Sequence, residues 1–135
     1  MITTLLLGFA VFGILVLMVI GRLTHRLRRP MNQRYFHTRW LETLEMVKTQ
    51  EGMVLAVINA DKLFDQALKR RGFHGKTMGE RLVSAQRALT DNDAVWFAHK
   101  LRNRLVHEPQ PRLHVRDAKQ ALAGFKQGLR DLGAL

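Results

Sequence analysis

Residues 94–108 read AVWFAHKLRNRLVHE and carry a clear helical periodicity. At about 100° per residue, the apolar side chains that share one side of this helix are Ala94, Phe97, Ala98, Leu101 and Leu105. Such a stripe is typical of a helix that packs against a core. The long segments from residue 35 onward have the same three- and four-residue spacing, and none alternates as a strand does. The sequence therefore predicts an all-α domain.

The helices on either side of this segment follow from apolar stripes and capping signals. Five helices are expected, over residues 35–50, 51–71, 77–89, 90–108 and 115–132. Trp40, Leu44 and Val47 form the apolar stripe of the first. Thr77 has capping-box spacing to the glutamate three residues later, and Pro109 disfavours helical geometry in the residue before it. We therefore expect a small four- to five-helix bundle over residues 35–135.

The N-terminal segment has a different composition. Residues 1–21 contain no charged side chain, and residues 5–20 (LLLGFAVFGILVLMVI) are almost entirely apolar. About 20 helical residues, at about 1.5 Å each, cross a hydrocarbon core of about 30 Å. A cleaved signal peptide is the alternative, but no basic region precedes the run and no small-residue cleavage site follows it. We predict a transmembrane helix over residues 1–21.

A basic linker follows the apolar run, over residues 22–34. Its first four arginines are Arg22, Arg26, Arg28 and Arg29. Cationic residues beside a span stay on the cytoplasmic side, where they also contact anionic headgroups. An RNA-binding arm is the alternative role for this cluster. We expect a single-pass protein of the cytoplasmic membrane, with the lipid bilayer as one partner and a soluble domain in the cytosol.

The length and composition of the chain limit the functions that it can have. The chain of 135 residues has room for one small core, which excludes a multidomain enzyme. Its 22 Lys and Arg residues against 11 Asp and Glu residues favour nucleic acid or anionic lipid as partners. Cysteine is absent from the sequence, which excludes disulfides, thiolate nucleophiles and cysteine-ligated zinc.

No cofactor and no metal ion are expected from the motifs. Gly72 and Gly75 precede Lys76 and Thr77 as in a phosphate-binding loop, but only two residues separate the glycines where that motif needs four. A helix cap followed by an N-cap explains this stretch. His99 and His107 lie about 12 Å apart along a helix axis, too far to share an ion.

The polar side of residues 94–108 is unusual for a solvated surface. An arc of about 140° on this helix holds Val95, Trp96, His99, Arg102, Asn103, Val106 and His107. Exposed helix faces are normally rich in Lys, Glu and Gln. The mixture of apolar and titratable groups indicates a face that another surface covers. A core that holds satisfied polar groups is the alternative.

Residues 102–107, RNRLVH, fit the R-N-x-x-x-H signature of HEPN domains. These domains are small helical bundles of toxin–antitoxin, CRISPR-associated and other RNA-targeting systems. The blocks at residues 56–65, 79–82 and 96–107 also resemble those of a bacterial, membrane-anchored HEPN-like group. The resemblance covers roughly residues 40–132, and it implies a HEPN-like fold for the domain.

The resemblance implies metal-independent RNA cleavage at the interface of a homodimer, where two copies of the motif face each other. His107 would be the acid/base group and Arg102 the phosphate clamp, because histidine titrates near neutrality and arginine offers a planar fork of donors. Asn103 would orient the imidazole or bind the scissile phosphate. One chain supplies one motif histidine, so a monomer should be inactive. RNA and a second copy of the chain are thus expected partners.

Three further residues are secondary site candidates. His99 lies one turn before Asn103 and has no counterpart in the family motif. Asp61 and Asp65 are four residues apart on a predicted helix and therefore project from one face. These carboxylates either add to the active site or pair with basic side chains of a neighbouring helix, Arg102 among them.

A second function stays open beside ribonuclease activity. HEPN toxins often carry a tyrosine two residues after the motif histidine as a site of nucleotide modification, and this chain has Pro109 there. We therefore do not expect that form of regulation. Some HEPN-like domains bind without cleaving. The alternative is a catalytically silent HEPN-like module that binds RNA, nucleotide or an unidentified partner protein at the membrane. A membrane scaffold is a third class that stays open.

Overall fold

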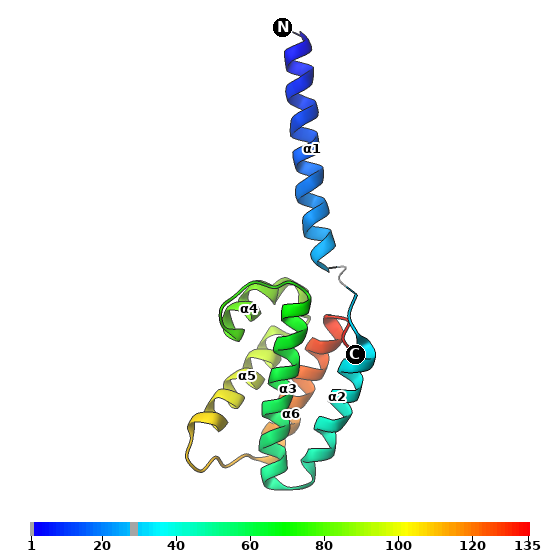
Figure 1. Cartoon of the computed structure of the whole chain (residues 1–135). Coiled ribbons are helices and arrows are strands. Elements are labelled where there is room, and N and C mark those ends of the chain that lie inside the picture. The colour runs from blue at the N-terminus through cyan, green and yellow to red at the C-terminus, as the bar shows by residue number, and fades with distance from the viewer. Residues whose placement is uncertain (1, 28–29) are drawn as a thin grey trace. The chain divides into compact units, whose positions relative to one another are not determined.

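The computed structural model describes the backbone of residues 2–27 and 30–135, and the side chains of residues 8–20 and 30–135. The chain divides into two units, Met1–Pro30 and Met31–Leu135. Six α-helices and two short 3₁₀ turns make up the described residues, and no strand occurs among them (Figure 1). The prediction of an all-α chain is confirmed.

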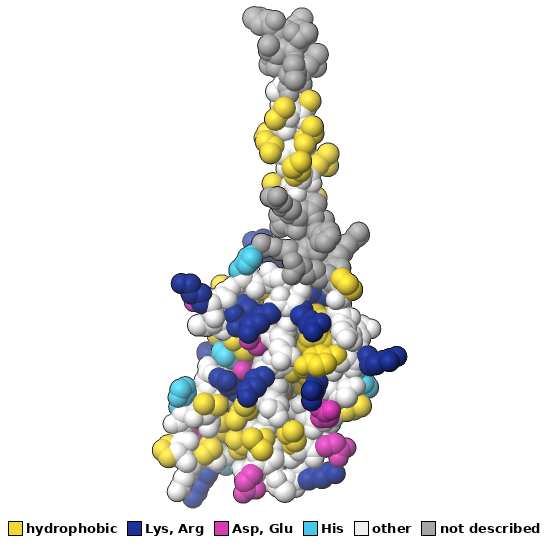
Figure 2. All heavy atoms as spheres, viewed as in Figure 1, with side chains coloured by type: hydrophobic (Ala, Val, Ile, Leu, Met, Phe, Trp, Pro, Cys, Tyr) yellow, Lys and Arg dark blue, Asp and Glu magenta, His cyan; other side chains and the backbone are white. Residues whose placement is uncertain are grey.

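The first unit is a single helix, α1 (Ile2–Leu27), which continues into the stretch predicted as a linker. Every residue from 8 to 20 except Gly13 is exposed, and Figure 2 shows hydrophobic side chains around this part of the helix. Within the described part of the chain, no helix has both the length and the apolar character needed to cross a membrane. The other residues of the predicted span lie outside the described side chains. So do the four linker arginines, Arg22, Arg26, Arg28 and Arg29.

The second unit is a helical bundle. Its elements are α2 (Gln33–Glu45), η1 (Met46–Lys48), α3 (Gln50–Arg70), α4 (Met78–Ala85), η2 (Gln86–Ala88), α5 (Asn92–His107) and α6 (Val115–Asp131). With the 3₁₀ turns included, these bounds differ from the predicted ones by at most two residues. In Figure 1, α3 and α6 lie between α2 on one side and α5 on the other.

Local capping explains where the helices begin. Thr49 has an extended backbone, and its hydroxyl accepts a hydrogen bond from the backbone N–H of Gly52 at 3.0 Å, which starts α3. A Cβ atom on Gly52 would lie 1.9 Å from the carbonyl oxygen of Met46, so this tight junction requires glycine. Asp91 caps α5 by accepting from the N–H of Ala94 at 2.9 Å.

The core is built around α3, α5 and α6, and α2 and α4 also contribute side chains to it. Its largest fully buried side chains are Phe36, Phe64, Phe125, Leu68, Leu82, Leu129, Val57 and Val95. The rings of Phe64 and Phe125 lie 5.8 Å apart between α3 and α6. Glycine allows a close crossing of α5 and α6, because a Cβ atom on Gly124 of α6 would lie 2.7 Å from the carbonyl oxygen of Ala94 in α5.

The stripe predicted for residues 35–50 is only partly in the core. Trp40 is buried, whereas Leu44 and Val47 are both 36% exposed. The 3₁₀ turn η1 ends α2 at Glu45 and changes the periodicity before Val47 is reached. Leu44 and Val47 instead line an apolar groove between α2 and α6.

Candidate functional site

A buried carboxylate on α3 faces the polar side of α5. Asp61 is 3% exposed, and its Oδ1 lies 2.8 Å from Nδ1 of His99, which is itself 8% exposed. Its Oδ2 lies 3.3 Å from Nε of Arg102, close enough for an ion pair but without the alignment of a hydrogen bond. Asp61 therefore holds two side chains that lie about one helical turn apart on α5.

Asn103 connects the same two side chains on their other side. Nη1 of Arg102 donates to Oδ1 of Asn103 at 2.9 Å, and Nδ2 of Asn103 lies 3.3 Å from Nε2 of His99. The side chains of Asp61, His99, Asn103 and Arg102 thus form a closed ring of polar contacts, which we call the polar ring. Two of the three motif residues belong to it.

The donors and acceptors of the polar ring fit one tautomer of His99. Arginine has only donors, so Asn103 turns its carbonyl oxygen to Arg102 and its amide group to His99. Nε2 of His99 must then accept, and its proton sits on Nδ1 and is donated to Asp61. Nε of Arg102 has no hydrogen-bond partner in this arrangement.

His107, the third motif residue, lies outside the polar ring. It is the last residue of α5, one turn beyond Asn103, and its side chain is exposed. Within residues 30–135, no hydrogen bond or ion pair joins it to another side chain. Val106 beside it is 48% exposed. The end of α5 therefore presents an unpartnered imidazole and an apolar side chain on the surface.

Two members of the helix arc that was predicted as a covered face are buried, namely Val95 and His99. Val95 is 1% exposed and lies in the core, so its expected place on a face covered by another surface is wrong. α5 packs against both α3 and α6, which makes its buried side wider than one apolar stripe. Trp96 is half-buried and approaches the His99 ring edge-on, with ring centroids 6.1 Å apart.

Asp65 takes part in a different cluster. Nε of Arg81 on α4 lies 2.7 Å from its Oδ1, and Nζ of Lys69 lies 2.8 Å from its Oδ2. Burial raises the pKa of Asp65, but hydrogen bonds and charge from Arg81 and Lys69 outweigh it and hold that pKa below its usual range. Arg81 also donates to the carbonyl oxygen of Gly75 at 2.6 Å. Asp65 thus anchors α4 to α3 and lies apart from the polar ring.

Arg81 is buried, although no role was predicted for it from the sequence. It is 7% exposed. The sequence does contain a signal for this burial, because Arg81 follows Met78 by three residues and precedes Ala85 by four, on the buried side of α4. An arginine on an apolar stripe needs a buried partner.

Among the described residues, no three His, Asp or Glu side chains are grouped so that they could hold a metal ion. The chain matches no model of a known family, no curated protein and no solved structure. Its function is therefore inferred from its own residues and their geometry.

Proposed function

We propose that this chain is a membrane-anchored HEPN-like protein whose cytosolic domain cleaves RNA without a metal ion, at a site completed by two copies. The proposal rests on the different surroundings of the three motif residues along α5. Arg102 and Asn103 are held in place by the buried Asp61 and His99, whereas His107 is exposed and unpartnered one turn further on. Fixed donors beside a free acid/base group suit phosphoryl transfer.

The chemistry needs one proton acceptor and one proton donor. The imidazole of His107 accepts the proton of a ribose 2′-OH as its oxygen attacks the adjacent phosphorus. The imidazolium of His107 in the second copy gives its proton to the departing 5′-oxygen. The bond from phosphorus to that oxygen breaks, which leaves a 2′,3′-cyclic phosphate and a 5′-hydroxyl. Arg102 stabilises the extra negative charge on the phosphate oxygens, and Asn103 orients the phosphate.

The membrane anchor is part of the same proposal. The apolar run of residues 5–20 and the arginines after it support a single span with the domain on the cytosolic side. A reporter fused to the C-terminus is expected to behave as cytoplasmic. Activity of a reporter that functions only in the periplasm would overturn this topology.

The experiment that tests cleavage uses the full chain, labelled RNA and EDTA. Wild-type protein is expected to yield products with 2′,3′-cyclic phosphate ends. His107→Ala should lower the rate by about 10²–10⁴-fold with an unchanged melting temperature, because general acid–base catalysis contributes that much. His37→Ala, which removes an exposed histidine from α2, is the matched control and should cleave normally. Cleavage that persists in folded His107→Ala protein would remove this site assignment.

A catalytically silent HEPN-like module that binds RNA, nucleotide or a partner protein is the second candidate. One observation favours it: the Arg102 guanidinium already contacts Asp61 and Asn103, so a structural role accounts for it. Under this candidate wild-type protein cleaves nothing, and Arg102→Ala melts several degrees lower. Under the ribonuclease proposal wild-type protein cleaves, whatever the stability of that variant.

A further inference from the structure

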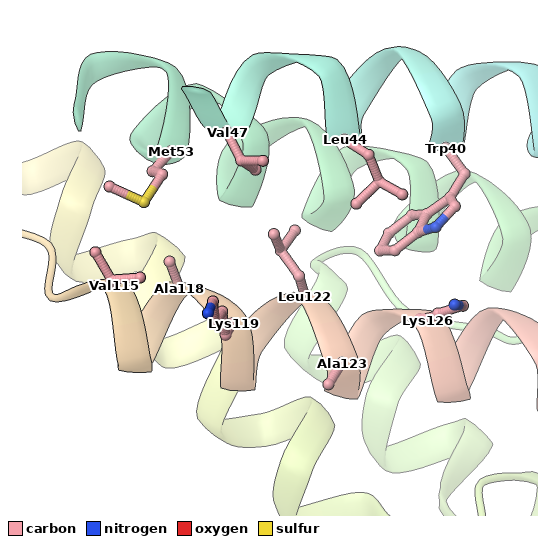
Figure 3. A pocket seen from close by; sticks show the side chains of 10 residues that line it. All are labelled: Trp40, Leu44, Val47, Met53, Val115, Ala118, Lys119, Leu122, Ala123 and Lys126. Carbon is pink, nitrogen blue, oxygen red and sulfur yellow. The ribbon is translucent and has the colours of Figure 1, made fainter. Parts of the chain in front are cut away.

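An open apolar groove runs between α2 and α6, away from the polar ring. It has a volume of about 320 Å³, near the lower end of the range for small-molecule sites. Leu44 and Val47 form one wall, and Ala118 and Leu122 form the other (Figure 3). In Figure 3, Leu122 lies opposite Leu44 and Val47, and Ala118 lies opposite Met53. The groove exists because two apolar side chains of the α2 region remain uncovered.

The buried indole of Trp40 lies at one end of this groove. Trp40 is 4% exposed, and its Nε1 has no hydrogen-bond partner. Figure 3 shows the indole between α2 and α6, with its nitrogen on the side of α6. A buried tryptophan N–H normally finds an acceptor. The described residues supply none for Trp40, which indicates an acceptor from outside the chain.

The charged residues that line the groove indicate what kind of group would accept the hydrogen bond of Trp40. Lys119 and Lys126 are the two charged residues among the ten that line the groove, and none of the ten is acidic. Lys126 lies at the same end as Trp40, Lys119 lies between Ala118 and Leu122, and Met53 and Val115 close the other end (Figure 3). The end at Trp40 therefore combines an unpartnered donor with a cation, which suits an anion, whereas the end at Met53 and Val115 suits hydrocarbon.

The dimensions fit an extended chain. Residues 115–126 of α6 line the groove over about 16 Å, at about 1.5 Å per residue. We propose that the groove binds a fatty acid, whose carboxylate accepts hydrogen bonds from Nε1 of Trp40 and Nζ of Lys126. The acyl chain lies along Leu44, Val47 and Leu122 toward Met53. Because Nε1 is shielded in the empty groove, binding requires a neighbouring side chain to move, and Lys126 has the rotatable stem to do so.

Tryptophan quenching in the full chain, reconstituted in lipid nanodiscs, tests this proposal. A Trp96→Phe background leaves Trp40 as the single tryptophan. Laurate brominated at the carbon next to its carboxylate is the probe, because the proposal places that end of the molecule beside the indole and bromine quenches an indole that it contacts. We expect saturable quenching of Trp40. The corresponding brominated dodecanol and dodecylammonium, which lack an anionic head, should quench only weakly.

Three variants separate groove binding from partition into the bilayer. Lys126→Glu should weaken laurate binding about tenfold or more, because it replaces a charge-assisted hydrogen bond with repulsion. Arg130→Glu is the matched control on α6, outside the lining, and should bind as wild type. Val47→Phe enlarges a side chain of the groove wall and should abolish saturable quenching. Each variant is checked for an unchanged melting temperature.

Other results would overturn the proposal. Equal quenching by the anionic, neutral and cationic probes would mean partition only. Binding that survives folded Lys126→Glu and Val47→Phe proteins would place the probe elsewhere. A Trp40 emission that shifts with protein concentration, without any response to laurate, would mean that a second copy covers the groove.

Discussion

The carboxylate of Asp61 is the most consequential single group in the domain. It is buried, and both of its oxygens face α5. A buried carboxylate is costly unless cations and donors satisfy it, and here His99 supplies a donor and Arg102 a positive charge. Replacement of any member leaves the others with unmatched polar atoms. The polar ring therefore couples the stability of the domain to the placement of two motif residues.

Asp61→Asn is expected to destabilise the domain. The amide oxygen can still accept from His99, but the amide nitrogen then points a second donor at Arg102. A charged group left unsatisfied costs about 2 kcal/mol or more in the free energy of unfolding. Glu108→Gln, which removes a weak exposed pair at 3.8 Å from Arg104, should cost less than about 0.5 kcal/mol. Urea unfolding at neutral pH measures both, and equal losses would contradict a structural role for the ring.

The ion pairs of Asp65 predict that the unfolding free energy of the domain depends on pH. Its pKa is lower in the folded chain than in the unfolded one, since the hydrogen bonds and charges of Arg81 and Lys69 outweigh its burial. Its contribution to stability is therefore fully present above the unfolded pKa and is lost as the pH falls through the lower, folded pKa. The difference in unfolding free energy between wild type and Asp65→Asn should shrink as the pH falls through this acidic range. A difference that stays constant would contradict the pairing with Arg81 and Lys69.

The close crossing of α5 and α6 fixes how the candidate site is presented, and glycine makes it possible. Gly124→Ala should destabilise the domain by more than about 1 kcal/mol, because the new methyl group would meet backbone rather than a mobile side chain. Gly79→Ala in α4 is the matched control. Its Cβ would make an ordinary contact with Trp96 at 3.6 Å, and alanine favours the helix by up to about 1 kcal/mol. Thermal unfolding should shift the two variants in opposite directions, and a stabilised Gly124→Ala protein would refute the tight crossing.

The helices could be predicted because periodicity and capping act within a few residues. The polar ring could not be assembled in this way, since Asp61 and His99 are 38 residues apart and meet only through the crossing of α3 and α5. The pairing of Asp61 with Arg102 was one of two alternatives from the sequence, and the geometry favours it. Val95 was misplaced because a helical wheel gives directions but not the width of the buried side. That width depends on how many neighbours a helix has.

Basic residues exceed acidic ones across the whole chain, and Figure 2 shows Lys and Arg side chains spread over one face of the helical domain. Such a surface attracts phosphate backbones and anionic lipid alike. The proposed anchor and the proposed RNA substrate thus use the same property of the molecule. Each chain supplies one acid/base histidine, so a basic surface does not by itself complete the proposed catalytic site. Whether two chains form a dimer therefore decides between the two candidate functions.

Dimerisation of residues 31–135 is the expected assembly, because these residues form a compact unit with their own core and leave Val106 and His107 open on α5. Sedimentation should show a dimer. Val106→Asp should raise its dissociation constant about tenfold or more, since an interface side chain would be replaced by a desolvated charge. Val83→Asp is the matched control, because Val83 is similarly exposed, at 58%, on α4.

If the domain is monomeric at high micromolar concentration, or if both variants dissociate equally, two copies of His107 do not meet through this face. In that case the binding module becomes the better candidate, because a single imidazole cannot both accept and donate a proton within one cleavage step.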